Sequence, residues 1–123
     1  MTRRDPRISL QQMRDHAREA LSLIAGRSRE ELDSDRMLNL SLVRLLEIVG
    51  EAAGRVPPQE RAKHPQIPWS DIIGLRNRLV HGYDRVDLDV VWEIVREDLP
   101  GLVAVLDRIL ASENGQDPTA GQA

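Results

Sequence analysis

The most apolar part of this chain reads Asp35-Arg-Met-Leu-Asn-Leu-Ser-Leu-Val-Arg-Leu-Leu-Glu-Ile-Val-Gly-Glu-Ala-Ala-Gly54. A helix with so little polar surface is buried on most sides, so we expect it at the centre of the molecule. Pro57 and Pro58 end this helix, because proline cannot continue the backbone hydrogen bonds. The few polar side chains recur at steps of three and four and form one narrow stripe: Ser41, Arg44, Glu47, Glu51 and Arg55.

Three further helical patterns flank this central segment. The first spans about residues 6 to 25, with Asp5 as its N-cap and apolar side chains along one stripe. The next spans about residues 69 to 81 and ends near Gly82. The last covers about residues 88 to 110, where Pro100 should kink the helix. Because no period-two strand pattern occurs, we predict an all-α, up-and-down four-helix bundle with short extra helical turns and a kinked last helix.

Length and composition favour one small folded domain. The 123 residues suit a single core, which we place at residues 1 to 111, followed by a disordered tail at 112 to 123. No apolar stretch is long enough to span a membrane, and we expect no secretory signal. The absence of cysteine excludes disulfides and thiolate metal sites and fits a cytoplasmic protein. The net charge of −3 argues against a protein that coats nucleic acid nonspecifically.

The third helical pattern contains one residue that conflicts with it. When this helix is projected at about 100° per residue, Leu75 and Leu79 lie on an apolar face and Arg76 falls inside that face. A buried guanidinium costs several kcal/mol unless a carboxylate or a phosphate meets it. Two structural explanations stay open. Arg76 pairs with Glu47 or Glu51 inside the bundle, or its stem crosses the core and its head reaches water.

The remaining polar residues give weaker signals. Asn77 and His81 lie four residues apart, so on a continuous helix they share a face and can form a hydrogen bond. Tyr83 reads most simply as a packed aromatic at a helix end, and His16 and His64 as ordinary surface residues. Glu47 and Glu51 have no His or Cys at ligand spacing, so we predict no metal site. The phosphate-binding, dinucleotide-binding and serine-hydrolase sequence signatures are absent from the chain.

Read as a string, residues 76 to 83 spell Arg-Asn-Arg-Leu-Val-His-Gly-Tyr and match R-x-x-x-x-H-x-Y. This string resembles the motif of the HEPN superfamily, and specifically of its HepT-like toxin branch. Three further segments resemble that branch in the same order: Leu46-Glu-Ile-Val-Gly-Glu-Ala-Ala53, His64-Pro-Gln-Ile-Pro-Trp69, and Val91-Trp92 through Leu99-Pro100. The resemblance covers roughly residues 7 to 111.

The resemblance implies a helical bundle that forms a homodimer and brings two copies of the motif into one cleft. It implies a metal-independent endoribonuclease without a cofactor, with Arg76 and His81 as catalytic residues and Asn77 and Tyr83 as supporting residues. It also implies a toxin–antitoxin system of the HepT/MntA type. In that system, a nucleotidyltransferase antitoxin neutralises the toxin by transferring AMP to the motif tyrosine, here Tyr83.

The implied chemistry is physically consistent. Metal-free RNA cleavage can use the adjacent 2′-hydroxyl as nucleophile, which needs a base, an acid and a cation near the phosphate. Two His81 imidazoles from two subunits would supply the base and the acid, and Arg76 would bind the phosphate oxygens. Glu47 and Glu51 are candidates for steering Arg76, although surface ion pairs with Arg44 and Arg55 are the simpler explanation of these two residues.

A function from another class stays open at this point. The chain can be a non-catalytic helical binding module that docks a nucleotidyltransferase or another protein. Its negative charge and its few aromatic residues support that interpretation, because single-stranded RNA is commonly bound by stacking bases on aromatic side chains.

Overall fold

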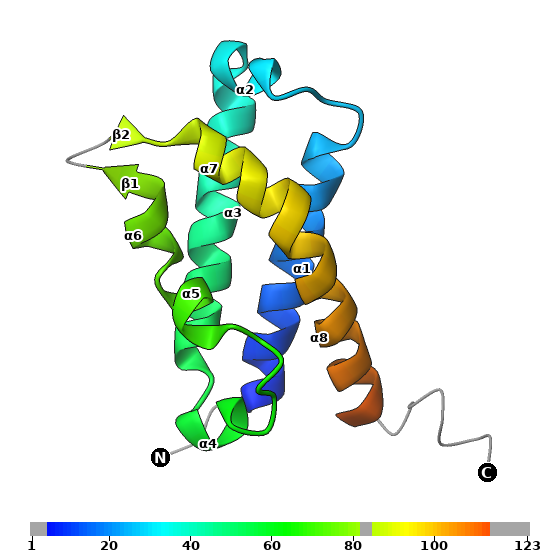
Figure 1. Ribbon diagram of the computed structural model, residues 1–123. Coiled ribbons are helices and arrows are strands. Elements are labelled where there is room, and N and C mark those ends of the chain that lie inside the picture. The colour runs from blue at the N-terminus through cyan, green and yellow to red at the C-terminus, as the bar shows by residue number, and fades with distance from the viewer. Residues whose placement is uncertain (1–4, 82–84, 114–123) are drawn as a thin grey trace.

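The computed structural model describes residues 5–81 and 85–113. Helix α3 (Arg36–Arg55) forms the centre of the fold, as the sequence predicts. It packs against α1, α2, α5, α6 and α7 (Figure 1). Asp35 caps its start, where the backbone N–H of Leu38 donates to the carboxylate at 3.0 Å. This hydrogen bond holds the pKa of Asp35 below its ordinary value. The cap therefore stabilises the fold above the ordinary pKa, and this contribution is lost as the pH falls through the lowered one.

The first helix and the short extra turns also follow the sequence. Helix α1 (Pro6–Ile24) begins after Asp5, whose side chain accepts a hydrogen bond from the Arg7 N–H, and packs between α3 and α8. Two short helices, α2 (Glu30–Ser34) and α4 (Pro58–Arg61), lie at opposite ends of the bundle (Figure 1). The prediction of short extra helical turns is confirmed.

The third predicted helix is divided, and this expectation was wrong. Helix α5 (Trp69–Ile73) stops at Gly74, and α6 (Leu75–Leu79) begins at the next residue. The chain then forms strand β1 (Val80–His81), which pairs antiparallel with β2 (Arg85–Val86). Val80 and Val86 face each other in this ladder, and β-branched side chains suit such extended positions. These strands have two residues each, so they are too short to give the period-two pattern that the sequence lacks, and the all-α fold class stands.

The last helical region continues past Pro100 without ending. Helix α7 (Leu88–Glu93) begins at the cap Asp87 and continues into a π-helical turn, η1 (Ile94–Asp98), and then α8 (Leu99–Glu113). The Leu99 N–H donates to the Ile94 carbonyl five residues back, one residue before Pro100, which has no N–H to give. Figure 1 shows the course of the chain bending between α7 and α8. Helix α8 runs two residues beyond the predicted domain boundary at 111, and the rest of the predicted tail lies outside the described residues.

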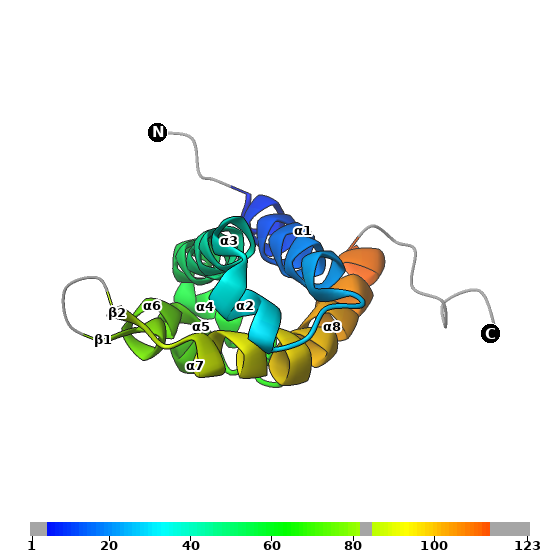
Figure 2. The same cartoon turned by 90° about the horizontal axis from the view of Figure 1, so that it is seen from above.

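Seen from above, α1, α3, α5 with α6, and α7 with α8 surround one apolar core (Figure 2). The all-α four-helix architecture is confirmed. None of the helices in the described part of the chain combines the length and the apolar character that crossing a membrane requires. The core is filled mainly by leucine, isoleucine and valine, and its largest fully buried side chains include Leu10, Leu42, Leu46, Leu79, Ile94 and Leu106.

Candidate functional site

Arg76 lies on the outer surface of the bundle, and its predicted place inside an apolar face was wrong. Its side chain is 79% exposed, while its helix neighbours Leu75 and Leu79 are buried as predicted. The reason is the break at Gly74, because α5 and α6 are separate helices and one continuous projection does not describe both. Arg76 therefore needs no partner to offset burial, and its guanidinium is open to an incoming anion.

Glu47 is the acidic residue that Arg76 meets. The Arg76 Nε lies 4.0 Å from Glu47 Oε2, and the Arg44 Nη1 lies 3.8 Å from Oε1 of the same carboxylate. Glu51 contacts Arg44 instead, at 3.4 Å. These contacts are long and the arginines are mostly exposed, so each pair contributes little to stability. Of the two acids proposed to steer Arg76, the structure brings only Glu47 to it.

The backbone of His81 lies in strand β1 and not in a helix. Its register partner on β2 is Arg85. The predicted Asn77–His81 pair assumed a continuous helix, which ends at Leu79, so the spacing argument for that pair no longer applies. Asn77 is exposed on α6. The side chain of His81 and all of Tyr83 lie outside the described residues.

Arg85 is a candidate that the sequence reasoning missed. A hairpin pattern in the sequence would have placed this cation opposite His81. The two strands have two residues each, however, and such short strands show no alternating pattern. As to metals, no group of three or more His, Asp or Glu side chains that could hold an ion occurs within residues 5–81 and 85–113.

His64 has a structural role, and its assignment to the open surface was wrong. Its side chain is only 14% exposed and lies 3.5 Å from the Glu60 carboxylate. The backbone carbonyls of Arg61 and His64 both accept hydrogen bonds from the Trp69 indole N–H, at 3.1 and 3.0 Å. These bonds fasten the loop after α4 to the start of α5. His16, whose Nδ1 lies 2.7 Å from the Gln12 carbonyl, is partly buried as well.

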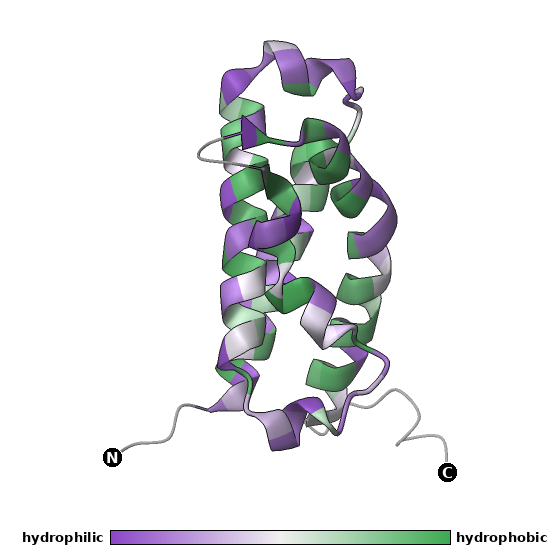
Figure 3. Ribbon diagram, turned by 60° about the vertical axis from the view of Figure 1, so that its left-hand side comes forward, coloured by the Kyte–Doolittle hydropathy of each residue, from purple (hydrophilic) through white to green (hydrophobic). Residues whose placement is uncertain are grey.

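The surface around Arg76 combines polar and apolar side chains. Along α3, Met37 is 80% exposed and Leu40 is 51% exposed, and both continue the stripe that contains Arg44 and Glu47. Figure 3 shows the hydrophilic middle of α6 beside α3. Ile73, at the end of α5, is 38% exposed. Contiguous exposed apolar patches with a polar rim are typical of protein contact surfaces.

Comparison with known proteins places this chain among ribonucleases. The HepT-like family model, described as ribonuclease HepT-like, matches residues 13–109. A protein of Caldanaerobacter subterraneus named "Putative RNase TTE0752" is 33% identical over 108 residues, which are 88% of this chain and 96% of the relative. A protein of Thermococcus cleftensis named "Probable ribonuclease HepT" is 35% identical over 95 residues, 74% of this chain and 86% of the relative.

A third relative, from Methanocaldococcus jannaschii and named "Putative RNase MJ1380", is 33% identical over 81% of this chain and 92% of its own length. No solved structure matches the chain. The family match covers the whole of α3, α5, α6, α7 and the hairpin strands, and most of α1 and α8. With its helical bundle and with Arg76 and His81 in the R-x-x-x-x-H-x-Y string, the chain belongs to the HepT-like ribonuclease family of the HEPN superfamily.

Proposed function

We propose that this protein is a cytoplasmic, metal-independent endoribonuclease whose catalytic residues are Arg76 and His81. The observation that carries the proposal is the exposure of the Arg76 side chain, in a chain that belongs to a ribonuclease family. Its guanidinium is 79% exposed and lies no closer than 4.0 Å to Glu47, so a phosphate can replace the carboxylate as its partner. Guanidinium binds phosphate oxygens through a planar pair of N–H donors.

Cleavage proceeds by attack of the RNA's own 2′-hydroxyl on the adjacent phosphorus. The O2′–P bond forms and the P–O5′ bond breaks, which leaves a 2′,3′-cyclic phosphate and a free 5′-hydroxyl. A neutral imidazole takes the proton from the 2′-hydroxyl, and an imidazolium gives a proton to the departing O5′. Arg76 stabilises the extra negative charge that gathers on the phosphate oxygens in the transition state.

The mechanism needs two histidines, and we propose that a homodimer supplies them. The exposed Met37 and Leu40 continue the stripe of α3 whose Glu47 meets Arg76, and Ile73 is exposed at the end of α5. Burying these side chains against a second copy removes apolar surface from water and brings two sets of motif residues together. Asn77 and Tyr83 then support the reaction by orienting the imidazole or by contacting RNA.

Chelation and a histidine variant test this mechanism together. Purified protein should cut single-stranded RNA in excess EDTA, and His81→Ala should lower the cleavage rate by about 100-fold or more, because it removes the proton-transfer group. His16→Ala is the matched control, since His16 lies on α1 away from the motif, and it should retain full activity. Electrophoresis of end-labelled RNA gives the rates. Loss of activity on chelation, or equal cleavage by His81→Ala, would contradict the proposal.

Regulation by a nucleotidyltransferase antitoxin extends the proposal. The phenolic oxygen of Tyr83 attacks the α-phosphorus of ATP, pyrophosphate leaves, and the bulky anionic AMP repels RNA from the cleft. Intact-mass spectrometry after co-expression with the nucleotidyltransferase should show the mass of AMP added to the parent and not to Tyr83→Phe. An addition that survives Tyr83→Phe would reject this assignment. Tolerated expression of the parent protein alone would favour the non-catalytic docking module instead of a toxin.

A further inference from the structure

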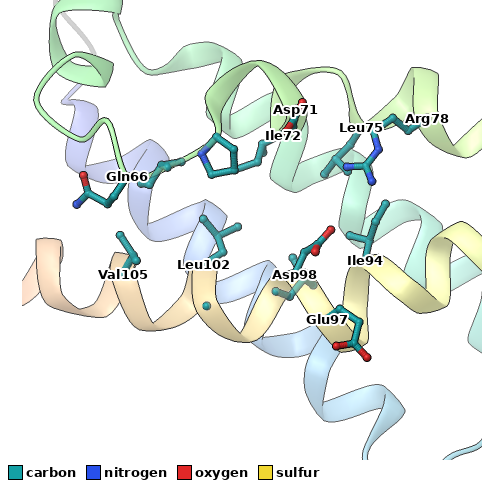
Figure 4. A pocket seen from close by; sticks show the side chains of 14 residues that line it. Gln66, Asp71, Ile72, Leu75, Arg78, Ile94, Glu97, Asp98, Leu102 and Val105 are labelled. Atoms are coloured by element: carbon teal, nitrogen blue, oxygen red, sulfur yellow. The ribbon is translucent and has the colours of Figure 1, made fainter.

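A groove of about 710 Å³ opens between α5–α6 on one side and η1–α8 on the other (Figure 4). Helix α5 packs on α3, and α8 packs on α1, so the bundle is open along the seam between α5 and α8. The floor of the groove is apolar and is formed by side chains from both walls, among them Ile72, Leu75, Ile94 and Leu102.

The rim of this groove is acidic. Asp71, Glu97 and Asp98 line it together with a single cation, Arg78. Figure 4 shows Asp98 and Arg78 projecting from opposite walls. Within the described ranges, neither Asp71 nor Asp98 takes part in an ion pair, and Glu97 meets only the exposed Arg96, at 3.9 Å. Three carboxylates against one guanidinium repel phosphate and attract lysine or arginine.

Gly101 forms an open part of the wall. It lines the groove from the first turn of α8, and a Cβ added there would meet no atom within 4 Å. A side chain at this position therefore has open space at its Cβ, and we expect a larger one to extend into the groove. The same position gives a way to block the groove while the fold stays intact.

The groove is separate from the proposed RNA-cleaving surface. Leu75 and Arg78, three residues apart on α6, line the groove, whereas Arg76 lies beside Glu47 on α3. We propose that the groove is a docking site for a protein partner, which inserts apolar side chains flanked by lysine or arginine from a short amphipathic helix. The apolar floor accepts the apolar side chains, and the carboxylates of the rim pair with the flanking cations. This inference does not rest on the ribonuclease proposal.

A model peptide provides the direct test. The probe is a fluorescent amphipathic helix of about 14 residues built from leucine and lysine, long enough to form a helix on binding. Fluorescence anisotropy measures its affinity for the wild-type protein and three variants. Gly101→Leu fills the groove, and the double variant Asp71→Asn with Asp98→Asn removes rim charge. Gly54→Leu is the matched control, because Gly54 is an exposed helical glycine on α3 whose added Cβ also meets no atom within 4 Å.

We expect Gly101→Leu and the double variant each to raise the Kd at least tenfold, with Gly54→Leu unchanged. A leucine–glutamate peptide with the same apolar positions should bind far more weakly than the lysine peptide. The double variant keeps the test decisive if Gly101→Leu fails to fold. Equal binding by all variants, or equal binding of both peptides, would overturn the proposal. Two other results would also overturn the proposal. One is binding of an RNA oligonucleotide that is lost in Gly101→Leu, and the other is self-association, measured by light scattering, that is lost in the same variant.

Discussion

Arg76→Ala is expected to lower kcat/KM for RNA cleavage by about 100-fold or more and to leave the unfolding midpoint nearly unchanged. The loss follows from the proposed role of the guanidinium, since removing one preorganised donor to a developing oxyanion costs about 10²–10³ in rate. Stability should not change, because the contact with Glu47 is long and the Arg76 side chain is 79% exposed. Initial-rate kinetics on a defined RNA and thermal unfolding measure the two effects.

Arg78→Ala is the matched control for this prediction. Arg78 lies on the same short helix and is also exposed, but it lines the groove and does not contact Glu47. Its removal should leave kcat/KM within about twofold. Arg76→Lys should fall between the parent and Arg76→Ala, because lysine keeps the charge and loses the two-pronged hydrogen bonding. A similar loss in Arg76→Ala and Arg78→Ala would mean that general positive charge, and not a specific phosphate contact, supports activity.

The long helices were predictable because local signals and apolar periodicity agree there. Asp5, Asp35 and Asp87 each cap a helix at the start that the sequence indicates. The break at Gly74 was not predictable, because Ile72, Leu75 and Leu79 continue a helical spacing across it and all three are buried. The spacing shows which side chains enter the core, and it does not show whether one helix or two carry them.

The site was predictable only in part, for the same reason. Arg76 attracted attention through a projection that fails at Gly74, and the motif string identified it independently of that projection. The sequence offered two acids, Glu47 and Glu51, as partners of Arg76. The packing of α6 against α3 brings Glu47 to Arg76, whereas Glu51 contacts Arg44. Arg85 was missed because a strand of two residues leaves no pattern in the sequence.

The position of α5 against α3 depends on Gly50, and Gly50→Ala should destabilise the protein by about 1–3 kcal/mol. A Cβ at this position would lie 2.9 Å from the backbone carbonyl oxygen of Ile72. A backbone atom cannot rotate away as a side chain can, so α5 itself must move. Urea unfolding measures the loss. Gly54→Ala, one turn later on the same helix and with open space around its Cβ, is the control and should gain up to about 1 kcal/mol.

The same substitution should also lower RNA cleavage in protein that is still folded. Gly50 follows Glu47 by about one helical turn on α3. Ile72 on α5 stands shortly before Arg76, which lies on the next helix, α6. A displacement of α5 therefore changes how Arg76 on α6 lies relative to Glu47. In the present packing the Arg76 Nε lies 4.0 Å from Glu47 Oε2. Rates measured well below the unfolding transition separate this effect from simple loss of folded protein. If Gly50→Ala were as stable and as active as Gly54→Ala, the close approach of α3 and α5 would have no part in building the site.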